Sequence, residues 1–149
     1  MKKIIAGILV VMMVLSSMAV FADGATILIN GEAAVISEGM GSVVEKQDRT
    51  FVPVRFVLEY FGYEVTWSDE DQLVLGRNTV GDIFAMQIGS PILIFKGVDG
   101  SSKTINMDVT PFLNYEEGRT YIPLRFLAEV LEYKVGWDGT TNTVTLDKE

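Results

Sequence analysis

The residues with the most suggestive spacing are two arginine–glutamate pairs. Arg55 precedes Glu59 by four positions, and Arg125 precedes Glu129 by the same interval. Residues four apart share one face of a helix, so each pair can form an ion pair. Acid catalysis by such a glutamate would need a second carboxyl group held across a cleft. Because the spacing supplies none, we interpret both pairs as structural.

Two further arginines are candidate ligand contacts. Arg49 opens the segment Arg-Thr-Phe-Val-Pro, and Arg119 opens Arg-Thr-Tyr-Ile-Pro. A guanidinium at the start of such a strand can hold an acidic ligand through a bidentate fork, or it can satisfy a nearby acid or carbonyl group. Both interpretations stay open for these two residues.

Aromatic residues form the second class of candidate contact. Tyr63 and Trp67 alternate with polar residues, as do Tyr133 and Trp137. This alternation predicts that the tryptophan rings lie in the core and that the tyrosines lie at its rim, where they can touch a ligand. Rings that pointed outwards instead would form a platform for stacking on carbohydrate.

Other residue types exclude several classes of site. The chain has no histidine and no cysteine, so triads and zinc or copper centres built on histidine are excluded. The acids at 69–71 lack the spacing of an EF-hand and predict a solvated hairpin tip. We therefore expect no catalytic residue, no metal and no cofactor. A group of acids at Asp108, Glu116 and Glu117 keeps a small carboxylate-based hydrolase or inhibitor as an alternative.

The first 22 residues have the layout of an export signal. Lys2 and Lys3 precede an uncharged apolar run that ends at Phe21-Ala22. This layout is typical of a secretory signal peptide cleaved after Ala22, although the run is nearly long enough to stay as an uncleaved membrane anchor. We expect a secreted, extracellular product that is released or held on the cell wall.

The net charge of the chain after residue 22 limits the classes of partner that it can bind. This part of the chain carries ten basic and twenty acidic side chains, a net charge of −10. Such a surface repels nucleic acid, anionic lipid and other polyanions at long range. We therefore expect no nucleic-acid partner, and no membrane contact once the signal is cleaved.

The candidate residues belong to a sequence that occurs twice. Residues 49–68 (the first copy) and 119–138 (the second copy) align at an offset of seventy, with nine identities in twenty positions. Each copy predicts a short strand, a helix of two to three turns with Pro53 or Pro123 as its first residue, and a hairpin. Gly62 suits the left-handed position that ends the first helix, and Glu132 takes that place in the second.

The rest of the chain predicts antiparallel strands. Asn30-Gly31 between apolar flanks predicts a hairpin, and Phe84–Ile88 alternates as a strand does. Ile92–Phe95 is a continuous apolar run, and an open edge there would allow self-association.

Together these elements predict an α+β fold with antiparallel strands wrapped around two short helices. We expect a single domain over 23–149, after the signal at 1–22, built from two repeats at about 25–78 and 79–149. A unit of that size alone buries a modest fraction of its surface, so we expect the two to cover each other about a pseudo-twofold axis.

The repeated motif resembles a known family. Gly-Arg-Thr-x-x-Pro-Leu-Arg-Phe-x-Ala-Glu-x-Leu at 118–131, followed by Tyr-x-Val-x-Trp-Asp at 133–138, is similar to the copper amine oxidase N-terminal-like (stalk) domain of exported Firmicute proteins. The resemblance covers 25–147 and implies a non-catalytic α+β module of secreted or cell-surface proteins. Asp48 and Glu132 depart from the glycines that are common at those positions in the family. Oxidase chemistry there needs histidine ligands, so the resemblance predicts no oxidase.

We therefore expect a secreted, non-enzymatic module that binds at the cell envelope. Its partner would be cell-wall glycan or another exported protein. A self-associating extracellular scaffold is one alternative, and the small hydrolase or inhibitor is the other.

Overall fold

The computed structural model describes residues 26–148. The predicted signal peptide and its cleavage after Ala22 lie outside these residues. Between residues 26 and 148, no helix is long and apolar enough to cross a membrane.

The described residues form short strands interrupted by two short helices. The helices are α1 (Val54–Tyr60) and α2 (Leu124–Val130). The strands are β1 (Thr26–Ile29), β2 (Glu32–Ala33), β3 (Val44–Lys46), β4 (Arg49–Pro53), β5 (Tyr63–Ser68), β6 (Leu73–Asn78), β7 (Ile83–Gln87), β8 (Ile92–Lys96), β9 (Ser102–Asn106), β10 (Phe112–Asn114), β11 (Arg119–Pro123), β12 (Tyr133–Asp138) and β13 (Thr143–Lys148).

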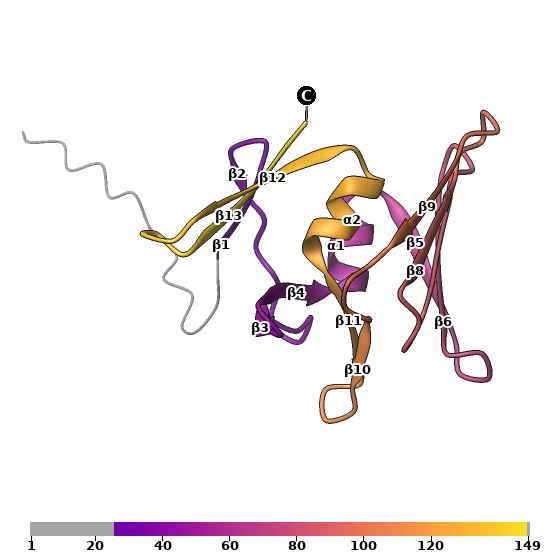
Figure 1. Cartoon of the computed structure of the whole chain (residues 1–149), viewed down its shortest axis with the longest axis horizontal. Coiled ribbons are helices and arrows are strands. Elements are labelled where there is room, and N and C mark those ends of the chain that lie inside the picture. The colour runs from indigo at the N-terminus through magenta and orange to yellow at the C-terminus, as the bar shows by residue number, and fades with distance from the viewer. Residues whose placement is uncertain (1–25, 149) are drawn as a thin grey trace, which may run out of the picture.

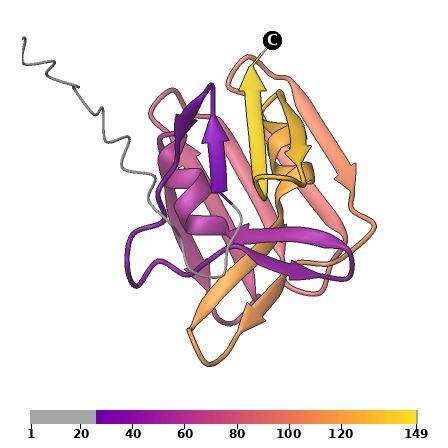
Figure 2. The same cartoon turned by 90° about the vertical axis from the view of Figure 1, so that its left-hand side faces the viewer.

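The strands form three sheets around the helices. A five-stranded sheet has the order β5-β6-β7-β8-β9, a second has the order β12-β13-β1-β2, and a third, which we call the seam sheet, has the order β10-β11-β4-β3. The helices lie between the first two sheets, and the seam sheet closes one end of that space (Figures 1 and 2). All pairings are antiparallel except that of β1 with β13, which is parallel. The predicted α+β class is confirmed.

The seam sheet joins the two copies of the repeated sequence. Strands β4 and β11 pair so that Val52 lies opposite Ile122, its counterpart seventy positions later. Both side chains are fully buried and belong to the main core cluster. On the other face of the same strands, Tyr121 stacks on Phe112, with ring centroids 5.2 Å apart. Both faces of the seam are therefore apolar and covered.

The helices begin and end nearly as the sequence predicts. Each proline is the N-cap rather than the first helical residue, since ψ is 122° at Pro53 and 120° at Pro123, which keeps both in extended geometry. The prediction was therefore wrong by one residue. Past the helix ends, Gly62 has φ of 81° and Glu132 has φ of 63°, so both take the predicted left-handed conformation.

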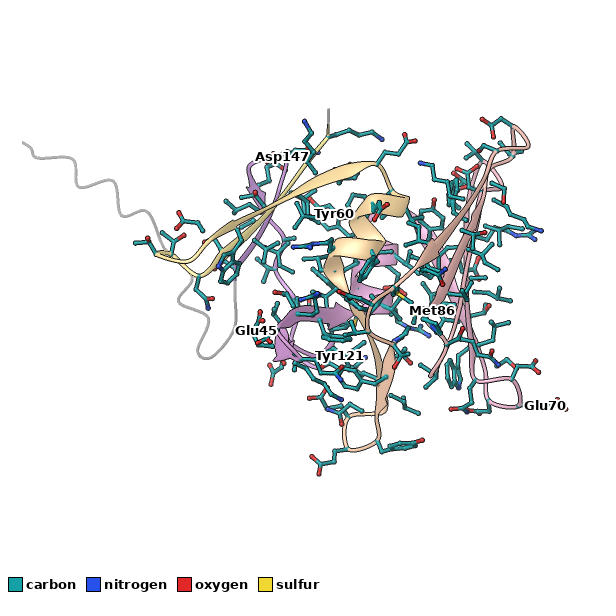
Figure 3. All side chains as sticks on the ribbon, viewed as in Figure 1. Glu45, Tyr60, Glu70, Met86, Tyr121 and Asp147 are labelled. Atoms are coloured by element: carbon teal, nitrogen blue, oxygen red, sulfur yellow. The ribbon has the colours of Figure 1, made fainter. Side chains whose placement is uncertain are left out.

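One apolar cluster fills the space between the sheets. The two helices contribute Val54, Phe56, Val57, Leu58, Leu124, Leu127, Ala128 and Val130. Met86 of the five-stranded sheet is buried against it, whereas Glu70 lies at the tip of the β5–β6 hairpin (Figure 3). Residues from both copies thus share one core among the described residues.

The predicted burial of the tryptophans was wrong for Trp137 and held in part for Trp67, which packs against the core cluster. Trp137 is 54% exposed and Trp67 is half-buried, while Tyr63, expected at the rim, is 6% exposed. Tyrosine, valine and tryptophan do share one face of each strand, as the alternation predicts. A seven-residue helix rises only about 10 Å, whereas six strand residues span about 20 Å. The helix therefore covers the tyrosine end of each strand and leaves the tryptophan end uncovered.

The expected open edge at Ile92–Phe95 was also wrong. This segment is β8, which pairs with β7 on one side and with β9 on the other. An interior strand has no free backbone groups to offer a second chain. The self-associating scaffold therefore lacks the open sheet edge on which that hypothesis depended.

Candidate functional site

Two clefts open where the tryptophan ends of the strands lie uncovered. The first cleft has a volume of about 180 Å³ and the second about 410 Å³. The first is lined by Pro53, Val54, Arg55, Val65, Thr66, Trp67, Val74, Leu113, Gly118, Arg119 and Thr120. The second is lined by Glu45, Asp48, Arg49, Thr50, Pro123, Leu124, Arg125, Val135, Gly136, Trp137 and Val144.

The two clefts are built from matching positions. Ten of the eleven lining residues of the first cleft have their counterpart, seventy positions away, in the lining of the second. Each cleft combines a helix arginine and a tryptophan of one copy with the strand arginine of the other. Arg119 thus lines one cleft with Arg55 and Trp67, and Arg49 lines the other with Arg125 and Trp137. The seam between β4 and β11 brings these distant residues together.

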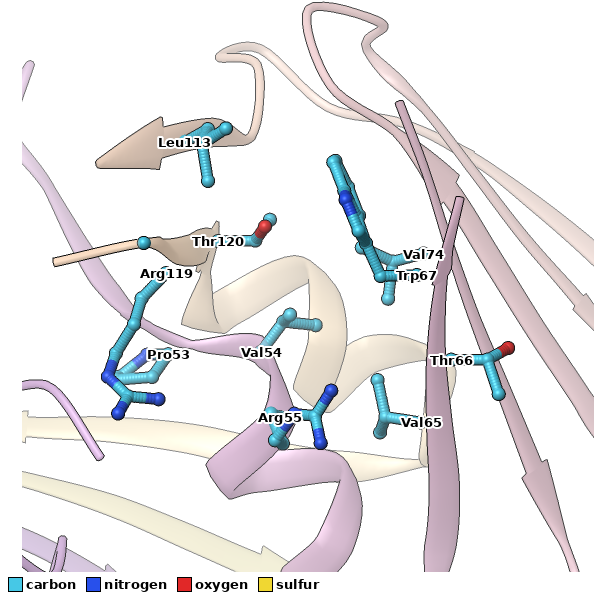
Figure 4. A pocket seen from close by; sticks show the side chains of 11 residues that line it. Pro53, Val54, Arg55, Val65, Thr66, Trp67, Val74, Leu113, Arg119 and Thr120 are labelled. Atoms are coloured by element: carbon cyan, nitrogen blue, oxygen red, sulfur yellow. The ribbon is translucent and has the colours of Figure 1, made fainter. Parts of the chain in front are cut away.

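The first cleft holds two arginines and no acid in its lining. Figure 4 shows Trp67 at one end of this cleft and the guanidinium groups of Arg55 and Arg119 towards the other, with Val54 between them. The Trp67 Nε1 donates to Asp69 Oδ1 at 2.5 Å, which fixes the indole. The Arg55 Nη1 lies 3.8 Å from Glu59 Oε1, which confirms the predicted pair. Within residues 26–148, the Arg119 guanidinium has no ion-pair partner.

The stem of Arg119 packs against a tight loop. Gly41 has φ of 98°, and a Cβ atom there would lie 2.7 Å from Pro53 Cγ and 3.2 Å from Arg119 Cδ. Only glycine fits both the backbone conformation and the space. This close approach restricts where the aliphatic part of Arg119 can lie.

In the second cleft, the strand arginine already holds a carboxylate. Arg49 grips Asp108 through two hydrogen bonds: Nε donates to Oδ1 at 3.3 Å, and Nη2 donates to Oδ2. Chiefly through these bonds, Asp108 raises the pKa of Arg49 and Arg49 lowers the pKa of Asp108. The lining adds the acids Glu45 and Asp48. Arg49 thus satisfies a local acid, as one of the two interpretations predicts, whereas a ligand contact at Arg119 stays a prediction.

The second helix lacks the ion pair of the first. Among the described residues, Arg125 and Glu129 form no ion pair within 4.0 Å, so that part of the structural interpretation was wrong. Trp137 also lacks the acceptor that Trp67 has, because Gly139 stands at the place of Asp69. The second cleft is therefore wider and its aromatic wall more exposed.

The two tyrosines lie in a groove separate from both clefts. Tyr63 and Tyr133 line it together, beside the end of α2. Burial, the largest cause, raises the pKa of Tyr63. The Tyr133 ring lies 4.9 Å from that of Phe61, and Lys148 Nζ lies 5.4 Å from its centroid. These tyrosines do not share a site with the arginines proposed alongside them.

The candidate acidic group is divided among different partners. Asp108 is held by Arg49, and Glu117 Oε2 accepts a hydrogen bond of 2.5 Å from the Tyr121 hydroxyl. Glu116 is exposed. Over residues 26–148, no three histidine, cysteine, aspartate or glutamate side chains gather as metal ligands would.

Comparison with known proteins shows the family to which this chain belongs. The model of the copper amine oxidase N-terminal domain matches residues 28–146, and the chain belongs to that family. In the copper amine oxidase family this is a non-catalytic, stalk-like domain. No curated protein and no solved structure matched the chain.

Sequence reasoning missed the role of Asp108 and of Gly41. Neither residue lies in the repeated motif, and both act on an arginine that is distant in the chain. One feature of the sequence could have predicted the paired clefts. Arginines and tryptophans recur at matching positions of the two copies, which predicts two similar sites if the copies pack together.

Proposed function

We propose that the chain is an exported, non-catalytic module that binds at the cell envelope, to wall glycan or to another exported protein. The observation that carries this proposal is the presence of two matching clefts, each with two arginines and a tryptophan. Arginine and tryptophan are enriched where proteins bind partners. The non-catalytic character of the family's domain and the signal-like first 22 residues support the same function.

The clefts owe their similarity, in this proposal, to an internal duplication with a pseudo-twofold axis. Three observations support it: nine identities in twenty aligned residues, helices of equal length in both copies, and the pairing of Val52 with its counterpart Ile122. An axis through that pair relates the first cleft to the second. The duplication then supplies two sites that can diverge separately.

Retention on isolated envelope material tests the function. Purified protein is incubated with wall sacculi and, separately, with the immobilised exported proteins of the source cells. We expect retention on one of them, reduced in the double variant Arg55→Gln, Arg125→Gln, which removes one exposed arginine from each cleft. The charge-matched control is Arg77→Gln, Lys96→Gln, two exposed basic residues outside the clefts. Retention on neither material would contradict the proposal.

A further inference from the structure

The two clefts differ in charge although their residues match. The lining of the first contains Arg55 and Arg119 and no acid, so its formal charge is +2. The lining of the second contains two arginines and two acids, and Asp108 also lies on Arg49. The whole chain has a formal net charge of −8. Outside the lining of the first cleft, Glu59 pairs with Arg55 and Asp69 holds the Trp67 indole, so the difference between the clefts depends on Arg119. Arg119 has no ion-pair partner within residues 26–148, and such an arginine is a local site for an anion on an acidic protein.

The second cleft indicates which anion suits such an arginine. There, Arg49 holds the carboxylate of Asp108 with two donors of one guanidinium. This planar fork matches a carboxylate in geometry as well as charge. The position seventy residues before Asp108 is Glu38, which makes no ion pair among the described residues. Arg119 therefore occupies the position that matches Arg49, but no carboxylate of the described residues is bound to it.

The other walls of the first cleft suit a sugar ring. Trp67 is half-buried, and its indole is held in place by Asp69. Thr120 contributes a hydroxyl group, and Val54 adds an apolar surface (Figure 4). At about 180 Å³ the cleft is smaller than the roughly 300 Å³ at which pockets for drug-sized ligands begin. It has room for one ring or side chain of a larger ligand.

We propose that the first cleft binds a carboxylate-bearing sugar unit of an acidic glycan. Arg119 and Arg55 hold the carboxylate, Trp67 contacts the face of the ring, and Thr120 bonds to one of its hydroxyl groups. In the second cleft, Asp108 neutralises the charge of Arg49 and takes the position that the ligand carboxylate has in the first. This inference rests on the proposed function and specifies its ligand class.

Calorimetric titration with trigalacturonate tests the site. Wild-type protein should bind one equivalent, and the trimethyl ester, which keeps the rings and removes the charges, should not bind. Arg119→Gln should weaken binding by about tenfold to a hundredfold, the effect of losing a hydrogen-bonded charge. Arg77→Gln, a change of one exposed arginine outside both clefts, should leave the affinity within about twofold. If Arg119→Gln fails to fold, Arg55→Gln at an exposed position provides the same test.

A variant that frees the second cleft sharpens the test. Asp108→Ala removes the internal carboxylate from Arg49 and should add a second, weaker equivalent of trigalacturonate. Equal binding of the ester, an Arg77→Gln loss as large as that of Arg119→Gln, or no binding by wild type would overturn the proposal. A single equivalent for Asp108→Ala would overturn the role given to Asp108.

Two further outcomes separate this inference from the proposed function. If sacculi retain wild-type protein and Arg119→Gln equally, the inference fails and the envelope function stands. If trigalacturonate binds at Arg119 while neither sacculi nor exported proteins retain the protein, the envelope function fails and the sugar site stands.

Discussion

The pairing of Val52 with Ile122 should couple the two copies energetically. Both side chains are fully buried, and they lie opposite each other on adjacent strands. Val52→Ala removes two carbon groups, about 1.6 kcal/mol by transfer, and the cavity raises the cost to about 2–3 kcal/mol. Ile122→Val should cost about 0.5–1.5 kcal/mol. Because the two buried side chains are cross-strand neighbours, we expect the space lost at one to be shared with the other, so the double variant should cost less than the sum.

The assay is urea unfolding of the wild type, both single variants and the double variant. We expect a coupling free energy of about 0.5 kcal/mol or more, with unchanged dependence on urea. In the control cycle, Val98→Ala takes the place of Val52→Ala. Val98 is 68% exposed, so Val98→Ala should change the free energy of unfolding by less than about 0.5 kcal/mol. Additivity within about 0.3 kcal/mol for the buried pair would refute the shared packing.

Three other changes test single features of the structure. Arg49 lowers the pKa of Asp108, so the ionised Asp108 stabilises the folded protein at any pH above the unfolded-state pKa of this carboxyl group. This stabilisation is lost as the pH falls through the lowered pKa. The melting temperature of the wild type should therefore exceed that of Asp108→Asn at pH 6, with the difference shrinking as the pH falls below about 4 and vanishing only below the lowered pKa of Asp108. Gly41→Ala should cost about 2–4 kcal/mol by clash and strain, whereas Gly39→Ala, also left-handed but with open space around it, should cost about 1 kcal/mol, both measured by urea unfolding. Glu132→Gly should melt several degrees above Glu132→Ala, because both lose the ion pair to Lys103 and only glycine relieves the positive φ.

Local signals in the sequence predicted local structure well. Asn30 and Gly31 form the expected tight turn between β1 and β2, and both have positive φ. Gly62 and Glu132 end their helices as predicted. Each of these features depends on residues that are neighbours in the chain, so the pattern contains the necessary information.

Features that depend on distant neighbours were harder to predict. Trp137 is exposed because a short helix cannot cover the whole of β12, a matter of relative element lengths rather than alternation. Ile92–Phe95 is interior because β9 pairs with it, and no residue of the run itself records that partner. The clefts likewise depend on the register of β4 against β11. Sequence patterns therefore identified the arginines as candidate contacts, but they did not predict that each cleft is lined by residues of both copies.

The central claim is that both copies form one cooperative body, since each cleft takes residues from both. Each copy contains one tryptophan, so Trp137→Phe leaves Trp67 as a reporter of the first copy, and Trp67→Phe leaves Trp137 as a reporter of the second. The decisive measurement is the urea midpoint by tryptophan fluorescence and by far-ultraviolet circular dichroism in each variant. The account predicts that the two midpoints coincide in both variants. A tryptophan that reports unfolding at a clearly different urea concentration from the backbone signal would contradict it.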